Sequence, residues 1–205
     1  MTAIATLKRK ISETEYLRLD REENREKNGK YEYFNQNLIY MPGGTLQHGS
    51  ISSNTNAELV FGVKQAKGAN SVFLDTKVNS HLDYKNYVYP DVVVSDGRPQ
   101  YEDEKKDILT NPLLIVEVLS DSTEGFDRGD KFKSYRNISS LKEYLLVSQH
   151  EKSVEQFYKD ETGRWQFGEI VTEGSLKLKS LNFEITIDDL YFNVELTPRT
   201  VENVE

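Results

Sequence analysis

The chain contains no cysteine, which excludes disulfide frameworks, zinc-thiolate sites and cysteine nucleophiles together. It has only three histidines, and no two of them have the spacing of metal ligands, so we do not expect a zinc hydrolase. No apolar run approaches the roughly 20 residues that span a bilayer, and the first residues lack the basic-then-apolar order of a secretory signal. We therefore expect a cytoplasmic protein that has no contact with a membrane.

The sequence also lacks an excess of positive charge. Its 205 residues carry 26 Lys and Arg against 34 Asp and Glu, which gives a formal net charge of −8. This balance disfavours a protein coated with basic patches, although a net charge says nothing about one local cleft. There is neither a repeat nor an interdomain linker, so we expect one domain over 1–205, with a core over about 12–192 and a frayed C-terminal tail.

Helix and strand signals alternate in the first third of the chain. Ser12 and Glu15 form a capping-box pattern, which predicts a helix that ends near Asn28. Two short strands around a tight turn predict a β-hairpin over 30–41. Apolar residues at helical intervals then predict a long, mostly buried helix over 45–67.

The middle and the end of the chain are rich in strand signals. The segments 71–79, 87–95 and 112–120 are bounded by turn residues, and we expect them to be neighbours in the core sheet. A helix is expected over 127–139. Further strands are expected over 143–148, 153–160 and 164–171, with a hairpin at 161–163 and a helical turn near 187–191.

Two acids stand where acids are costly. Glu117 interrupts an apolar strand, and Asp91 opens another one directly behind Pro90. An ionised carboxylate taken out of water loses several kcal/mol unless a metal, a cation or hydrogen bonds replace its hydration. Since alternate side chains of a strand share a face, Glu117 should point in the same direction as Ile115 and Leu119. A partner for each carboxylate is therefore expected.

If the two strands pair, the two carboxylates can meet. Asp91, Glu117 and the backbone carbonyl of Val118 would then form part of an octahedral oxygen site for Mg²⁺, with Mn²⁺ as its substitute. Because nearby acids repel each other, at least one of them should have a raised pKa without metal. The simpler alternatives are that Asp91 caps a strand end and that Glu117 forms a salt bridge with an Arg or Lys at the edge of the core.

The motifs YPDVVV, IVEVLS, DRGDKFKSYR and EYLLV follow one another in this order. They resemble the PD-(D/E)XK nuclease superfamily and, over about 12–192, its restriction-endonuclease-like family of the Uma-two type, which is abundant in cyanobacteria. The resemblance implies an α/β restriction-endonuclease-like fold, that is, a mixed β-sheet flanked by helices. It also implies a metal-dependent endonuclease that hydrolyses DNA phosphodiester bonds, with a homodimer by analogy.

The sequence departs from the superfamily at one position, because Leu119 stands where a lysine is usual. The resemblance suggests that this lysine has moved to the following helix, at Lys131 or Lys133. Lys131 is favoured, since Tyr135 lies one turn away on its face. Its ammonium would stabilise the attacked phosphate or orient a water, a task that depends on position in space. Lys133 points about 200° away around the helix.

Two further residues are candidates for the cleft. The resemblance places Glu32 near it, whereas a solvent-facing charge on a strand is the alternative. His48 lies near the start of the long helix and can bind a phosphate or water, but a helix-capping or core histidine would look the same. Tyr84, Tyr87 and Tyr89 can stack on bases or pack within the strands.

A rival function belongs to a different class: a catalytically silent nuclease-fold protein that binds nucleic acid or a partner protein. Leu119 at the lysine position supports it, and so does the acidic net charge, which weakens attraction to phosphate. The charged run 102–107 is expected to be a solvated loop, and a structural homodimer built on strand edges is a third possibility.

Overall fold

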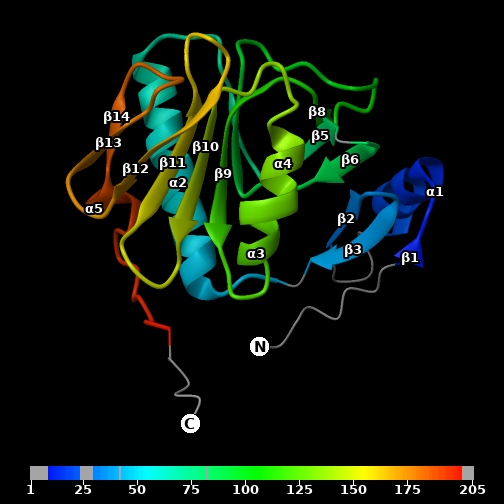
Figure 1. Ribbon diagram of the computed structural model, residues 1–205, viewed down its shortest axis with the longest axis horizontal. Coiled ribbons are helices and arrows are strands. Elements are labelled where there is room, and N and C mark those ends of the chain that lie inside the picture. The colour runs from blue at the N-terminus through cyan, green and yellow to red at the C-terminus, as the bar shows by residue number, and fades with distance from the viewer. Residues whose placement is uncertain (1–8, 24–29, 42, 82, 200–205) are drawn as a thin grey trace.

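The computed structural model describes residues 9–23, 30–41, 43–81 and 83–199. Two six-stranded sheets form its framework (Figure 1). The first sheet has the order β1 (Arg9–Lys10), β3 (Asn37–Met41), β2 (Lys30–Phe34), β6 (Lys85–Val88), β5 (Lys77–His81) and β8 (Ile108–Leu109). The second has the order β12 (Trp165–Val171), β11 (Val154–Lys159), β10 (Glu143–Ser148), β9 (Pro112–Leu119), β7 (Val92–Ser95) and β4 (Val72–Leu74).

Strand β9 lies at the centre of the second sheet. It pairs antiparallel with β7, where Val92 is opposite Val116, and parallel with β10, where Glu117 is opposite Leu146. The expected pairing of the strand after Asp91 with the strand of Glu117 is therefore confirmed. The sheet is mixed and helices flank it, so the expected α/β fold class is confirmed as well.

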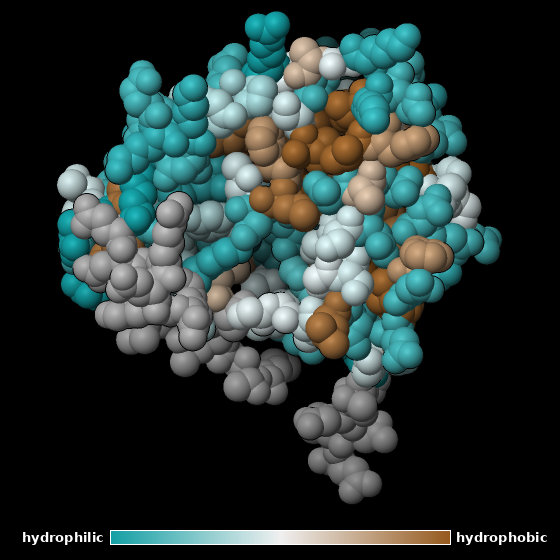
Figure 2. All heavy atoms as spheres, turned by 180° about the vertical axis from the view of Figure 1, so that it is seen from behind, coloured by the Kyte–Doolittle hydropathy of each residue, from teal (hydrophilic) through white to brown (hydrophobic). Residues whose placement is uncertain are grey.

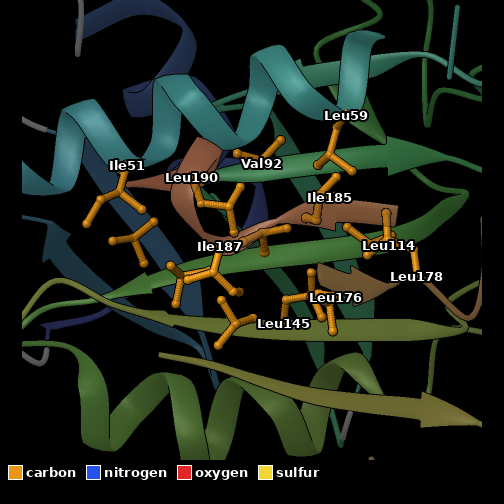
Figure 3. Packing of buried hydrophobic residues seen from close by; sticks show 14 of the residues in the cluster. Ile51, Leu59, Val92, Leu114, Leu145, Leu176, Leu178, Ile185, Ile187 and Leu190 are labelled. Carbon is orange, nitrogen blue, oxygen red and sulfur yellow. The ribbon is translucent and has the colours of Figure 1, made fainter. Parts of the chain in front are cut away.

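Helices cover both faces of this sheet. On one face lies α2 (Leu46–Gln65), whose Ile51 and Leu59 belong to the same hydrophobic cluster as Leu114 of β9 (Figure 3). On the other face, α3 (Glu124–Phe126), the π-helical turn η2 (Asp127–Lys131) and α4 (Phe132–Tyr135) form one continuous helical stretch, in which Tyr135 packs with Ile115. The strand is buried on both sides, and alternate residues face opposite layers, as the sequence predicts.

The expected helix boundaries are largely confirmed. Helix α1 (Glu13–Arg18) begins after Ser12, whose hydroxyl accepts a hydrogen bond from the Glu15 amide, and a π-helical turn, η1 (Leu19–Glu23), follows it. The expected end near Asn28 lies outside the described residues. None of the helices in the described ranges is both long and apolar enough to cross a membrane.

The expectation that α2 is mostly buried is wrong. Its outer face is open, with Leu46 89% and Phe61 59% exposed, because the helix packs on the sheet along one side only. Seen from behind, the molecule shows hydrophobic patches within a mainly hydrophilic surface (Figure 2).

The expectation that 71–79, 87–95 and 112–120 are neighbours in the core sheet is confirmed in part: β4, β7 and β9, one from each segment, are consecutive strands of the second sheet. The first two segments do not stay in this sheet along their whole length. The first segment bends at Asp75, which has a φ of 53°, and continues from β4 into β5 of the other sheet. The second does the same at Pro90, between β6 and β7. The Asp75 amide donates a hydrogen bond to the Asp91 carbonyl at 3.2 Å, so the two bends lie side by side where the sheets part.

The C-terminal part follows its predicted elements. β11 and β12 form the hairpin expected at 161–163, and β13 (Ser175–Lys177), β14 (Glu184–Thr186) and α5 (Ile187–Leu190) come after it. Of the tail that was expected to fray, residues 196–199 contact the body of the protein: a ring nitrogen of His150 lies 2.8 Å from the Thr197 carbonyl oxygen, and Arg199 pairs with Glu124. Residues 200–205 lie outside the described part.

Gly62 provides a test of the packing of α2. A Cβ atom at this position would lie 2.2 Å from the Phe183 ring, whereas one at Gly49 of the same helix would meet no atom within 4 Å. We expect Gly62→Ala to lower the free energy of unfolding by about 1–3 kcal/mol through overpacking. Gly49→Ala should leave it unchanged or raise it by up to about 1 kcal/mol. Urea denaturation of both variants measures this, and equal stabilities would contradict the packing.

Candidate active site

A cavity of about 580 Å³ opens beside the two bends. Six of the residues singled out from the sequence line it: His48, Tyr89, Asp91, Glu117, Val118 and Lys131. They come from α2, the bend before β7, strand β9 and the helical stretch that follows it. Lys133 is exposed and does not belong to this lining.

Lys131 is the centre of a buried charge cluster. Its side chain is 1% exposed, and its Nζ lies 3.1 Å from Glu32 Oε1, 3.2 Å from Glu117 Oε1 and 3.2 Å from Asp127 Oδ1. The solvent-facing alternative for Glu32 is wrong, since this residue is fully buried. The alternative for Glu117, a salt bridge with an Arg or Lys, is confirmed, and the partner is Lys131, which is itself a candidate site residue.

Burial and neighbouring charge set the protonation of the cluster. Burial opposes an ammonium at Lys131, but the charges of Glu117, Glu32 and Asp127 outweigh it and hold the pKa of Lys131 well above its usual value. Burial also raises the pKa of Glu32 and that of Asp127. The lysine therefore stays protonated.

Glu117 has the raised pKa that was expected of one of the two acids. Burial is its main cause; the charge of Lys131 opposes it, and the charges of Asp127 and Asp91 add to it. Repulsion between neighbouring acids thus contributes, but less than the loss of water does. Tyr135, one turn after Lys131, donates its hydroxyl to Glu117 Oε1 at 2.9 Å.

Asp91 is fixed from two sides. Its Oδ2 accepts the Val118 amide at 2.7 Å and lies 3.2 Å from Nε2 of His48. Burial disfavours the charged imidazole, but the hydrogen bond and charge of Asp91 outweigh it and raise the pKa of His48. The histidine is held in place because Thr45 caps its helix and accepts the His48 amide at 3.1 Å. By accepting the Val118 amide, Asp91 connects the bend before β7 to strand β9, next to Glu117.

The donor chemistry of this pair fits a hard divalent cation. Within the described ranges, the hydrogen bonds and ion pairs of Asp91 use Oδ2 and those of Glu117 use Oε1, which leaves Oδ1 and Oε2 without a protein donor. Both residues line the cavity with Val118, whose carbonyl is a third hard oxygen. No three Asp, Glu or His side chains of the described residues form a metal-ligand group. An ion here would need the backbone carbonyl and water as further ligands.

Asp127 was missed by the sequence analysis. It is buried in the cluster and lines the cavity, four residues before Lys131 on the same helical stretch. An acid four residues before a lysine is a recognisable helical pair, but the same spacing is common on solvated faces. Its burial depends on tertiary packing, which a local spacing does not reveal.

Known proteins resemble this chain in sequence and in fold. A family model named Uma2, described as "Putative restriction endonuclease", matches residues 14–189. Two relatives come from Synechocystis. "Uncharacterized protein slr1290" is 34% identical over 89% of this chain and 92% of its own length. "Uncharacterized protein sll1609" is 33% identical over 85% of this chain and 95% of its own length. A crystal structure described as a "putative nuclease belonging to DUF820" from Anabaena variabilis has a similar fold, with a TM-score of 0.69, 18% identity and coverage of 88% of this chain and 97% of that one.

Proposed function

Because the chain belongs to the Uma2 family, we propose that it is a metal-dependent endonuclease that hydrolyses phosphodiester bonds of DNA. One observation carries the proposal: Asp91 and Glu117, each with one oxygen that accepts no hydrogen bond from the described residues, line the same cavity as Lys131, whose pKa is held well above its usual value. Two hard ligands and a cation are what the hydrolysis of a charged phosphodiester requires.

The residues of the site have separable roles in this proposal. Asp91, Glu117 and the Val118 carbonyl would hold Mg²⁺, or Mn²⁺ in its place, which neutralises the phosphate and lowers the pKa of a bound water. Lys131 fixes Oε1 of Glu117 and adds positive charge near the phosphate, while Glu32 helps to hold its ammonium.

His48 has a positioning role in the same scheme. The imidazole Nε2 and the Val118 amide both contact Oδ2 of Asp91, so together they fix the carboxylate and orient its other oxygen. Its charged form also adds a positive group to a cavity that is mostly acidic.

A second candidate function rests on the burial of Lys131. Its ammonium contacts three carboxylates and its side chain is 1% exposed, so the lysine is already paired within the protein and has little access to a phosphate. This favours a nuclease-fold protein that binds nucleic acid or a partner protein without cutting it. The two candidates differ in whether DNA is cleaved when a divalent ion is supplied.

Cleavage assays decide between them. Purified protein incubated with supercoiled, linear and branched DNA should nick or cut at least one of these with Mg²⁺ or Mn²⁺, and none in EDTA. Asp91→Asn should abolish the activity, because it removes an anionic ligand. Asp91 directly precedes β7, and Asp96 is an exposed acid directly after the same strand, so Asp96→Asn should retain the activity. Cleavage in EDTA, or an active Asp91→Asn protein, would contradict the proposed mechanism.

The proposal extends to assembly and location. Cutting both strands of a duplex takes two active sites, so we propose that the protein acts as a homodimer in the cytoplasm. Light scattering on the protein used in the cleavage assays measures its mass. A monomer that cuts both strands at one position would contradict the dimer.

A further inference from the structure

A second cavity, of about 540 Å³, adjoins the candidate active site. The two cavities share Asp75 and Tyr89 as wall residues. The remaining wall comes from η1, from β4, the bend after it and the start of β5, and from the loop 101–107. Its volume is within the range of roughly 300–1,000 Å³ typical of small-ligand sites, so it can hold a nucleotide but not a duplex.

The two cavities differ in charge. Five acids and two lysines line the first, whereas three acids and four basic residues line the second. The acids of the second cavity already have partners: Asp20 lies 2.5 Å from Lys77 Nζ, and Asp107 lies 2.8 Å from an Arg21 nitrogen. An anionic strand is therefore attracted to the second cavity and repelled by the first until an ion is bound there.

Two lysines on the rim are available to a ligand. Lys105 and Lys106 line the second cavity and are exposed, and neither forms an ion pair within the described part of the chain. They belong to the charged run 102–107, for which the sequence predicts only solvent exposure. Because they lie beside a cavity, these lysines can also contact a ligand bound there.

The cavity also contains an open aromatic ring. Tyr89 already has partners within the protein: its hydroxyl donates a hydrogen bond to Asp20, and the ammonium groups of Lys30 and Lys77 lie 5.6 and 5.9 Å from its ring centre. Tyr101 is 37% exposed and stacks on no other ring in the described ranges. A base can therefore stack on Tyr101.

We propose that the second cavity binds an unpaired nucleotide that flanks the scissile phosphate. Lys105 and Lys106 contact its phosphates, and Tyr101 stacks on its base. This inference rests on the proposed endonuclease function and narrows the substrate to DNA with a single-stranded stretch beside the cleavage point. Tyr89 links the two sites, since its amide donates to Glu32 at 2.9 Å and Glu32 contacts Lys131.

Binding of short fluorescent oligonucleotides in EDTA, followed by anisotropy, tests the proposal without cleavage. Lys105→Ala/Lys106→Ala should weaken binding of single-stranded DNA roughly 10-fold, and the salt slope should fall by about 1.4, since each contact contributes about 0.7. Lys64→Ala/Lys67→Ala is the matched control: both lysines are exposed, Lys64 in the last turn of α2 and Lys67 just after the helix, and Lys67, like Lys106, has a positive φ. It should bind like the wild type.

Tyr101 gives an independent measurement. Tyr101→Ala should weaken binding roughly 5- to 100-fold, the range for the loss of one stacked base, and Tyr101→Phe should retain it. Equal affinities for both lysine double variants, no effect of Tyr101→Ala, or no binding of single-stranded DNA by the wild type would each overturn the subsite. If the same variants lost as much affinity for fully paired duplex DNA as for single-stranded DNA, the proposal that the bound nucleotide is unpaired would be overturned. The endonuclease proposal fails separately, by absence of cleavage with Mn²⁺.

Discussion

Glu117→Gln is expected to lower the cleavage rate by about 10³-fold or more and to leave the protein folded. An ion that loses one of two carboxylate ligands gives up several kcal/mol of charge stabilisation, and each 1.36 kcal/mol is a factor of ten in rate. The fold survives because glutamine has the same size and removes a buried charge whose pKa burial had raised. Calorimetric titration with Mn²⁺ and cleavage assays measure the two losses.

The pH dependence of Mn²⁺ binding adds a second readout for Glu117. A protonated carboxyl does not bind metal, so affinity in the wild type should weaken as the pH falls toward the raised pKa of Glu117. The residual binding of Glu117→Gln should depend less on pH over the same range.

Glu143→Gln is the matched control. Glu143 is another fully buried acid, on the neighbouring strand β10, but it lies outside the cavity lining and accepts the amides of Lys179 at 3.0 Å and Ser180 at 2.8 Å. Glutamine there replaces an acceptor with a donor, so it should lower stability by about 1–3 kcal/mol and leave the activity of the folded protein intact. Equal loss of cleavage in the two variants would show that Glu117 has no special role.

The direction of the site residues could be predicted, because strand and helix periods fix it. The period of two placed Glu117 on the face of Ile115, and the helical period placed Lys131 on the face of Tyr135. Both follow from local geometry, which a sequence carries in full. Confirmed pairing of β7 with β9 then brought Asp91 to the same place.

The cavity itself could not be predicted. It exists because two extended segments leave one sheet and enter another, at Asp75 and Pro90. Proline signals an interruption of hydrogen bonding, but not where the chain goes next, and a positive φ at an aspartate has no strong local signal. The burial of Asp127 and Glu32 depends on the same packing, which is why one was missed and the other remained ambiguous.

Lys131→Met is expected to lower the free energy of unfolding by about 3–5 kcal/mol. Methionine fills a similar volume, but three buried carboxylates then lose the cation that they share, and an uncompensated buried charge is strongly destabilising. Without the lysine, the folded-state pKa values of the acids rise further above their unfolded values, so folding takes up protons and the deficit should shrink as the pH falls. Urea denaturation at pH 8 and pH 5 measures both effects.

The role of Lys131 in cleavage is separable from this structural role. In Lys131→Met/Asp127→Asn, one of the stranded acids is neutralised as well, so the double variant should regain part of the lost stability and keep its Mn²⁺ binding through Asp91 and Glu117. Its cleavage rate should remain about 10²- to 10³-fold low, the loss typical of removing one electrostatic stabiliser of a transition state. Lys133→Met, two positions along and exposed, should change stability by less than about 0.5 kcal/mol and cleavage little. A stable double variant that cleaves at the wild-type rate would leave Lys131 with a purely structural role, and a loss of cleavage confined to Lys133→Met would identify that lysine instead.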